Sequence, residues 1–130
     1  MTLLKEVMSR HFETLDPDTI MSEALRKLEA LNLSQLLVCR NDRVVGVLEE
    51  NHLWNRIQAS GCDPAQTPVR EFMSPNVLSG YEEQEVKDLV SPMRTRNVHA
   101  IPVLNRESRI VGLFTLGGPW KRATPERSDS

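Results

Sequence analysis

The hydrophobic positions of this chain recur first with the period of a helix and then gather into two short apolar runs. The helical spacing spans residues 20–31, and its inner face is Ile20, Met21, Ala24, Leu25, Leu28 and Leu31. Residues 36–39 and 44–48 follow as apolar runs of strand length, and Asn41-Asp42-Arg43 between them is typical of a tight hairpin turn. Because the first run is apolar on both faces, we expect a strand that is covered on both sides.

Shorter elements flank this core pattern. Residues 12–15 form a short extended piece before a turn at 16–19, in which Asp18 or Thr19 can cap the helix that follows. A second helix is predicted over 50–60, with Leu53, Trp54 and Ile57 on one face. The order of elements is therefore β-α-β-β-α.

The second part of the chain has the same order of elements. An extended piece at 77–78 precedes a helix over 83–96, and strands are predicted at 100–104 and 110–115. The inner face of that helix is Val86, Leu89, Val90 and Met93. Pro92 removes a backbone donor, so we expect a kink or an early end there. Gly117-Gly118-Pro119 allows at most a short final helix starting near Pro119.

Matched segments show that the two parts are copies of one unit. Val7-Met8-Ser9 recurs as Phe72-Met73-Ser74 at an offset of 65, and the run at 44–48 recurs at 110–114 at an offset of 66. One extra residue in the second hairpin turn explains the slip. We therefore predict a duplication, with units at 1–62 (including an N-terminal helix) and 63–123, and a polar, disordered tail at 124–130.

Composition excludes several classes of partner. The 130 residues are 39% hydrophobic, which is enough for a core, and 16 basic against 18 acidic residues give a net charge of -2. This balance offers no basic surface for nucleic acid. No apolar run approaches membrane-spanning length and no signal peptide is visible. With only two cysteines, the sequence favours a cytoplasmic protein without a disulfide scaffold.

Catalytic and metal-binding patterns are missing from the sequence. The histidines and cysteines do not follow a compact ligand spacing; they are His11, His52, His99, Cys39 and Cys62. No serine or cysteine lies in a signature for an activated nucleophile. The glycines at 112–118 lack the lysine of a phosphate-binding loop, so a close-packing position and a broken helix explain them better. We expect neither an enzyme nor a metal site.

Three features together resemble the CBS domain, a small motif that occurs in tandem pairs. They are the Met-Ser that opens each copy, the Asn97-Val98-His99-Ala100-Ile101-Pro102-Val103 run, and Arg-Ile-Val-Gly-Leu-Phe-Thr at 109–115 with its counterpart at 43–48. The resemblance covers roughly residues 5–122. It implies an α+β fold in which two β-α-β-β-α units pack sheet to sheet with pseudo-two-fold symmetry, and it implies flat homodimers that regulate another protein.

The resemblance also implies two clefts between the units that bind adenosine-containing ligands. In the family pattern Gly-x-x-Thr/Ser-x-x-Asp, the hydroxyl and the helix N-terminus bind phosphate, the aspartate binds the ribose, and backbone groups contact the base. Thr115 keeps the hydroxyl, but Gly118 replaces the aspartate, and the first copy has Glu49 and His52 at these two places. The predicted ligand contacts are Thr14, Gln35 and His52 in the first copy, and Ser79, Gly80, His99, Ala100, Ile101, Thr115, Gly118 and Lys121 in the second.

Two functions remain open from the sequence. One is a sensor that binds AMP, ADP, ATP or S-adenosylmethionine and signals to an effector protein, with the second-copy cleft favoured because Thr115 and Lys121 suit an anion. The other is a degenerate pair with empty clefts that serves as a dimerisation or docking scaffold, which the missing aspartates favour. Neither requires an obligatory cofactor.

Overall fold

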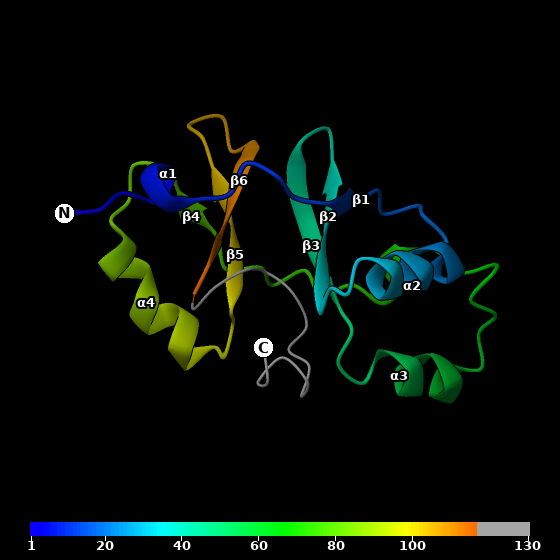
Figure 1. Cartoon of the computed structure of the whole chain (residues 1–130). Coiled ribbons are helices and arrows are strands. Elements are labelled where there is room, and N and C mark those ends of the chain that lie inside the picture. The colour runs from blue at the N-terminus through cyan, green and yellow to red at the C-terminus, as the bar shows by residue number, and fades with distance from the viewer. Residues whose placement is uncertain (117–130) are drawn as a thin grey trace.

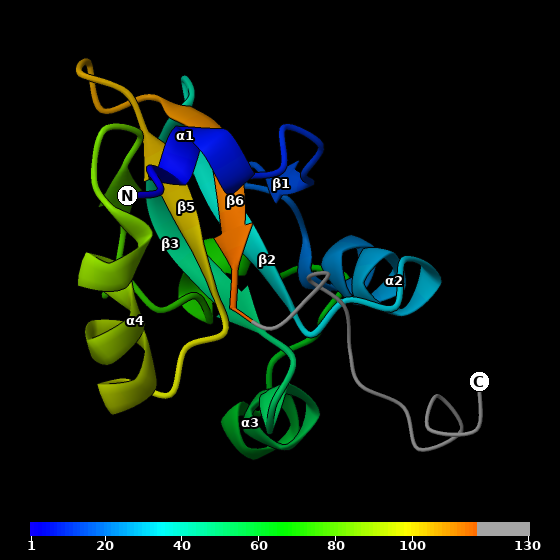
Figure 2. The same ribbon diagram turned by 60° about the vertical axis from the view of Figure 1, so that its left-hand side comes forward.

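Two similar halves lie side by side in the computed structural model, which describes residues 1–116 (Figure 1). Each half contains one three-stranded sheet, with the orders β1-β2-β3 and β4-β5-β6. The two sheets stand next to each other in the middle of the molecule, and helices α2, α3 and α4 lie on the outer sides (Figures 1 and 2). The fold is therefore mixed α+β, with two sheets packed face to face as the sequence predicts.

The element bounds show how closely the two copies correspond. The helices are α1 (Leu4–Val7), α2 (Met21–Ala30), α3 (Leu53–Ser60) and α4 (Val86–Thr95), with a short 3₁₀ helix η1 at Val69–Glu71. The strands are β1 (Thr14–Leu15), β2 (Gln35–Arg40), β3 (Arg43–Glu49), β4 (Gly80–Tyr81), β5 (Ala100–Leu104) and β6 (Ile110–Thr115). Strands β5 and β6 match the predicted ranges, and β2 and β3 extend the predicted ones by a residue or two.

The hairpins follow the sequence signals. In each sheet a short strand pairs in parallel with the middle strand, which pairs antiparallel with the last. Asn41 and Asp42, between β2 and β3, both have positive φ, 56° and 63°. Two consecutive left-handed residues give the twist that a two-residue hairpin needs, and Asn and Asp tolerate that conformation. The predicted tight turn is confirmed.

The segments that open the two copies cross to the opposite half. Leu4 of α1 is fully buried with Leu89, Met93 and Ile101 in the core of the second half. Val69 and Phe72, which occupy the equivalent positions in the second copy, are buried in the core of the first half. Figure 1 shows α1 lying over the second half before the chain runs across to β1. Each core is therefore completed by residues from the other copy.

Backbone pairing and two glycines fix this crossing. Ser9 exchanges two hydrogen bonds of 2.8 Å with Leu113 of β6, and Ser74 exchanges bonds of 2.8 and 2.9 Å with Val47 of β3. A Cβ on Gly46 would lie 2.7 Å from Met73 Sδ and 3.0 Å from Ser74 O. Gly112 is overlaid in the same way by Met8 and by Ser9 O, the latter at 3.0 Å. The repeated Met-Ser and Val-Gly motifs are thus two sides of one contact.

A third apolar cluster joins the two sheets. Its buried members are Leu37 of β2, Ala100 of β5 and Leu113 of β6. Leu36 and Val38 point the other way, into the first core. The middle strand is therefore covered on both faces, as its continuous apolar run predicts.

Several local predictions for the first copy were wrong. Helix α2 begins after Ile20 without a side-chain cap, because Asp18 instead bonds to the guanidinium groups of Arg40 and Arg70. Helix α3 begins at Leu53 rather than residue 50, after His52 in a left-handed conformation. Trp54 has 53% of its surface exposed and is outside the core.

The second copy also differs from two predictions. The short strand β4 lies at residues 80–81 rather than 77–78. Helix α4 does not end early at Pro92: it continues to Thr95, and Pro92 O accepts a hydrogen bond from Arg96 N. A kink at Pro92, the other expected outcome, stays a prediction. Pro92 is the seventh residue of this ten-residue helix. Leu89 and Met93, on either side of it, are buried and pack the helix against the core. The predicted final helix near Pro119 and the tail at 124–130 lie outside the described residues.

Candidate functional site

A polar cleft lies where the ends of the first sheet meet the loop before β5. Its first-half wall is formed where β2 begins and β3 ends, and its second-half wall is the turn between α4 and β5. The cavity measures about 370 Å³, within the range of small-molecule sites, and is lined by Ser34, Gln35, Glu49, Asn51, Arg96, Asn97, Val98 and His99. Both copies of the repeat therefore contribute to one cavity.

The turn that forms the second-half wall follows from the way α4 ends. Asn97 has a φ of 55°, and Val98 N donates to Met93 O at 2.8 Å, closing the last turn of the helix. Asn is one of the few residues that ends a helix in this left-handed conformation readily. Asn32 does the same after α2, with a φ of 54° and a bond from Leu33 N to Leu28 O. The sequence feature that shapes this wall is thus repeated.

The two walls carry opposite charges. Glu49 lies on the first-half wall, where Gln35 Nε2 donates to its Oε2 at 3.4 Å. Arg96 lies on the second-half wall, where its Nη2 donates to Asn76 O at 3.2 Å. Within residues 1–116 neither Glu49 nor Arg96 forms an ion pair. Each charged group makes one hydrogen bond and keeps further hydrogen-bonding capacity within the part of the chain that the structure describes.

The structure brings together some of the residues that the sequence predicted. Gln35 and His99 line this cavity together, although the sequence assigned them to different clefts. Thr115 lies opposite Ala100 in the β5–β6 pair, and Leu116 N donates to His99 O at 2.8 Å. His99, Ala100 and Thr115 are therefore neighbours at the end of the second sheet.

Other predicted contacts lie elsewhere. Ile101 is fully buried in the second core, and Gly80 is buried between Leu4 and Ile101. Thr14 pairs with Leu37 in the first sheet, and Ser79 directly precedes β4. His52 is exposed at the start of α3 and does not line the cavity. Gly118 and Lys121 lie outside the described residues.

Several lining residues were missed by the sequence analysis. Asn51, Arg96 and Asn97 were not singled out as contacts, and Glu49, the last residue of β3, was noted at the family's hydroxyl position but was not among the predicted contacts. For Arg96 and Asn97 the usable signal was their closeness to His99 in the sequence, and for Glu49 and Asn51 it was their closeness to His52. What the sequence could not supply was the crossing that places the end of β3 opposite the end of α4.

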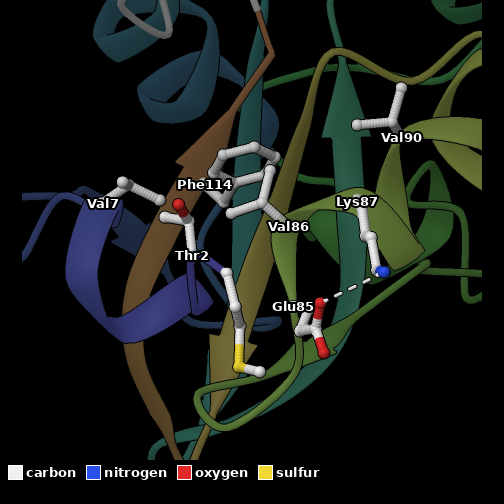
Figure 3. A pocket seen from close by; sticks show the side chains of 8 residues that line it. Thr2, Val7, Glu85, Val86, Lys87, Val90 and Phe114 are labelled. Carbon is white, nitrogen blue, oxygen red and sulfur yellow. Dashed lines mark ion pairs between the residues drawn. The ribbon is translucent and has the colours of Figure 1, made fainter.

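A second cavity lies on the outer side of the second half (Figure 3). It measures about 710 Å³, and its lining is largely apolar: Met1, Thr2, Val7, Glu85, Val86, Lys87, Val90 and Phe114. An ion pair between Lys87 Nζ and Glu85 Oε1, at 3.6 Å, lies at its side. Among residues 1–116, none of the predicted ligand contacts lines this cavity.

Perturbed ionisable groups lie away from both cavities. A hydrogen bond from the backbone N–H of Asp18, with help from Arg40, lowers the pKa of Asp16. Burial, with the nearby Asp42 carboxylate, raises the pKa of the Cys39 thiol to about 11, so this cysteine stays protonated at neutral pH. Among the described residues no group of three or more histidines, cysteines or acidic residues could hold a metal ion. None of the described helices is long and apolar enough to cross a membrane.

Comparison with known proteins identifies the repeat. The sequence profile of the CBS domain matches residues 4–53 and again residues 69–117. The chain belongs to the CBS domain family. Both CBS matches begin at the crossing segments, at Leu4 and Val69, and each runs through the strand pair of its copy.

Among curated proteins, the CBS domain-containing protein YhcV of Bacillus subtilis is 26% identical over 117 residues, which is 90% of this chain and 82% of that protein. An inosine-5'-monophosphate dehydrogenase of Methanocaldococcus jannaschii is 25% identical over 118 residues, which is 90% of this chain but only 23% of the enzyme. The CBS pair therefore recurs both as most of a protein and as a small part of a larger one.

Solved structures share the fold. The CBS domain structure NE2398 superposes with a TM-score of 0.80 at 23% identity, covering 90% of this chain and 94% of that one. CBSX2 in complex with AMP gives 0.77 at 19% identity, covering 90% and 92%. The CBS pair of protein MJ0100, in complex with 5'-methylthioadenosine and S-adenosyl-L-methionine, gives 0.73 at 23%, covering 88% and 90%. These likenesses confirm the CBS-pair architecture.

Proposed function

We propose that this CBS pair is a non-catalytic regulatory module that binds an adenosine-containing ligand between its two repeats and signals to a partner protein. The observation that carries the proposal is the polar cleft formed jointly by both copies. A ligand there contacts Gln35 and Glu49 on one half and Arg96 and His99 on the other. Binding would therefore change the free energy of any movement between the halves, which is the requirement for a signal.

The family relationship indicates the class of ligand. CBSX2 was solved with AMP and MJ0100 with 5'-methylthioadenosine and S-adenosyl-L-methionine, and both share this fold. The cleft here offers amide groups from Gln35, Asn51 and Asn97, which suit the donors and acceptors of a purine and a ribose. Thr115, which pairs with Ala100 at the end of the second sheet, supports a second contact region there.

A thermal-shift screen of the full chain tests this function. The panel is AMP, ADP, ATP, S-adenosylmethionine and 5'-methylthioadenosine, with ribose 5-phosphate as the control that lacks the base. A ligand present at a hundred times its dissociation constant stabilises the fold by about 2.7 kcal/mol, which gives a clear rise in Tm. Gln35→Ala and Thr115→Ala then distinguish the two regions. A flat response to every adenosine compound contradicts the proposal.

The second candidate function is a scaffold with empty clefts. It is favoured by one observation, that His52 stands where the family pattern has its ribose-binding aspartate and lies exposed outside the cleft. A scaffold is expected to form a homodimer or a complex with an effector protein whether or not nucleotides are present. Light scattering with and without ligand distinguishes this function from the sensor, since only the sensor's assembly or stability responds to ligand.

A further inference from the structure

The charges of the polar cleft indicate which adenosine-type ligand it selects. Among the described lining residues, Glu49 on one wall is acidic and Arg96 on the other is basic. A carboxylate and a guanidinium on different walls give the cavity a negative side and a positive side, with a net charge near zero. A ligand gains from both sides only when it carries a cation and an anion itself.

Neither charge is neutralised by a protein group in the described residues. Glu49 accepts one hydrogen bond, 3.4 Å long, from the neutral amide of Gln35. Arg96 donates one bond to the carbonyl oxygen of Asn76. A carboxylate can accept about four hydrogen bonds and a guanidinium can donate five, so each keeps most of its capacity. A ligand with matching charges would complete both sets.

A phosphate group matches this cleft poorly. A nucleotide phosphate is an anion, and it can pair with Arg96 only while remaining inside the same 370 Å³ cavity as the Glu49 carboxylate. Like charges brought close without a counter-ion raise the free energy of the complex. A cationic group opposite Glu49 reverses the sign of that interaction.

We propose that this cleft selects a zwitterionic adenosine-type ligand, with an amino or sulfonium cation facing Glu49 and a carboxylate facing Arg96, over nucleoside phosphates. This inference rests on the proposed function and adds the chemical class of the ligand. Glu49 is the discriminating residue, since it attracts the cation and repels the phosphate. Arg96 binds the anion of either ligand and so contributes affinity without discrimination.

Isothermal titration of the full chain tests the inference with three probes. S-adenosylmethionine carries an ammonium and a sulfonium cation together with a carboxylate, AMP carries the phosphate, and 5'-methylthioadenosine carries no charged group. We expect Glu49→Gln to weaken S-adenosylmethionine about tenfold, strengthen AMP and leave 5'-methylthioadenosine unchanged, because a hydrogen bond to a charged group is worth about one factor of ten at an exposed site. Arg96→Gln should weaken S-adenosylmethionine and AMP alike.

Glu23→Gln is the matched control, because Glu23 is an exposed carboxylate on α2 that does not line the cleft. It removes the same charge and should leave all three affinities unchanged. Glutamine keeps the size and polarity of the exposed glutamate, so unliganded Glu49→Gln should unfold at the wild-type temperature, which confirms that the cleft is intact.

The possible results distinguish a failure of the proposed ligand selectivity from a failure of the proposed adenosine-binding function. Unchanged S-adenosylmethionine affinity in Glu49→Gln, with binding otherwise normal, overturns the selectivity and leaves the adenosine sensor standing. Wild-type protein that binds none of the three probes overturns both. An affinity for AMP that falls in Glu49→Gln would also contradict the inference, because it would make Glu49 a positive contact for the phosphate ligand.

Discussion

The two halves of this CBS pair bury the same kind of surface to different extents. In the first half, α3 lays Leu53 and Ile57 against the core, and both are almost fully buried. In the second half, residues of the N-terminal segment, of the start of α4 and of β6 instead line an open cavity of about 710 Å³ (Figure 3). Phe72 of the crossing segment is 8% exposed in the first half, whereas its counterpart Val7 is 50% exposed in the second.

This difference shows which parts of the repeat hold the fold. The strand pairs, the crossing segments and the helices α2 and α4 correspond in order and pairing, including the Ser9–Leu113 and Ser74–Val47 bridges. In the first half α3 covers the outer face, and the corresponding segment of the second copy lies outside the described residues. The shared frame is therefore built from the sheets and the crossing.

The largest expected loss of stability comes from truncating a buried side chain of α3, which covers the outer face of the first half. Leu53→Ala removes a side chain that is 1% exposed, and deleting such a residue destabilises a protein by about 2–5 kcal/mol. Val86→Ala on the open face of α4 should lower the free energy of unfolding by less than about 1.5 kcal/mol, because a half-buried valine loses less burial. Urea unfolding of both variants measures the difference. Equal losses would show that the two faces are equally covered in solution.

The crossing predicts that an N-terminal residue stabilises the second half. Leu4→Ala should cost about 2–5 kcal/mol, because Leu4 is fully buried among Leu89, Met93 and Ile101. Val7→Ala, on the exposed side of the same helix, is the matched control and should change stability little. Hydrogen exchange then locates the effect: faster exchange in β5 and α4 is expected, and faster exchange confined to the first half would contradict the crossing.

An intermediate effect is expected at the glycine contacts. Gly112→Ala places a methyl group against Met8 and Ser9 O, and Gly46→Ala does the same against Met73 and Ser74 O. Overpacking of this kind costs about 1–3 kcal/mol. The double variant Gly112→Ala/Met8→Ala should lose less free energy of unfolding than the two single variants lose together, since truncating Met8 relieves the overlap. Additive losses in that double-mutant cycle would argue against the Met8–Gly112 contact.

The smallest effect is expected from the exposed ion pairs, which also correspond between the halves. Asp18 pairs with Arg70 and Arg40, and Glu83 pairs with Lys5 at 3.2 Å. Asp18→Asn and Glu83→Gln should each destabilise less than the core and glycine substitutions above, because solvent and salt screen exposed charges. Raising the salt concentration should reduce both effects, and an effect that is insensitive to salt would show that these pairs do not act through charge.

The same cluster gives a pH dependence. The pKa of Asp16 is lowered in the folded protein, so its contribution to stability is present above the unfolded pKa, about 3.9, and is lost as the pH falls through the folded value. The stability difference between wild type and Asp16→Asn should therefore be larger at pH 7 than at pH 2. A difference that grows on acidification would reverse the sign of this prediction.

The sequence by itself was sufficient for the repeat, the strand pairs and the fold class. The apolar runs at 36–39 and 100–104 predict buried strands, and Asn41-Asp42 predicts a hairpin turn. Both signals can be read from the sequence because they depend on neighbouring residues alone. Boundaries that depend on competing partners were predicted less well. Asp18 had the right chemistry to cap α2, but it pairs with Arg40 and Arg70, which the sequence places 22 and 52 residues away.

Only the tertiary structure decided the crossing and the cleft. The pairing of Ser9 with Leu113 joins residues far apart in the chain, and their local sequence carries no information on which sheet they meet. That pairing brings the two copies together, and Gln35 of the first then shares a cavity with His99 of the second. Local residue patterns specify elements because their hydrogen bonds and burial are short-range, whereas a site between two repeats depends on how those elements pack.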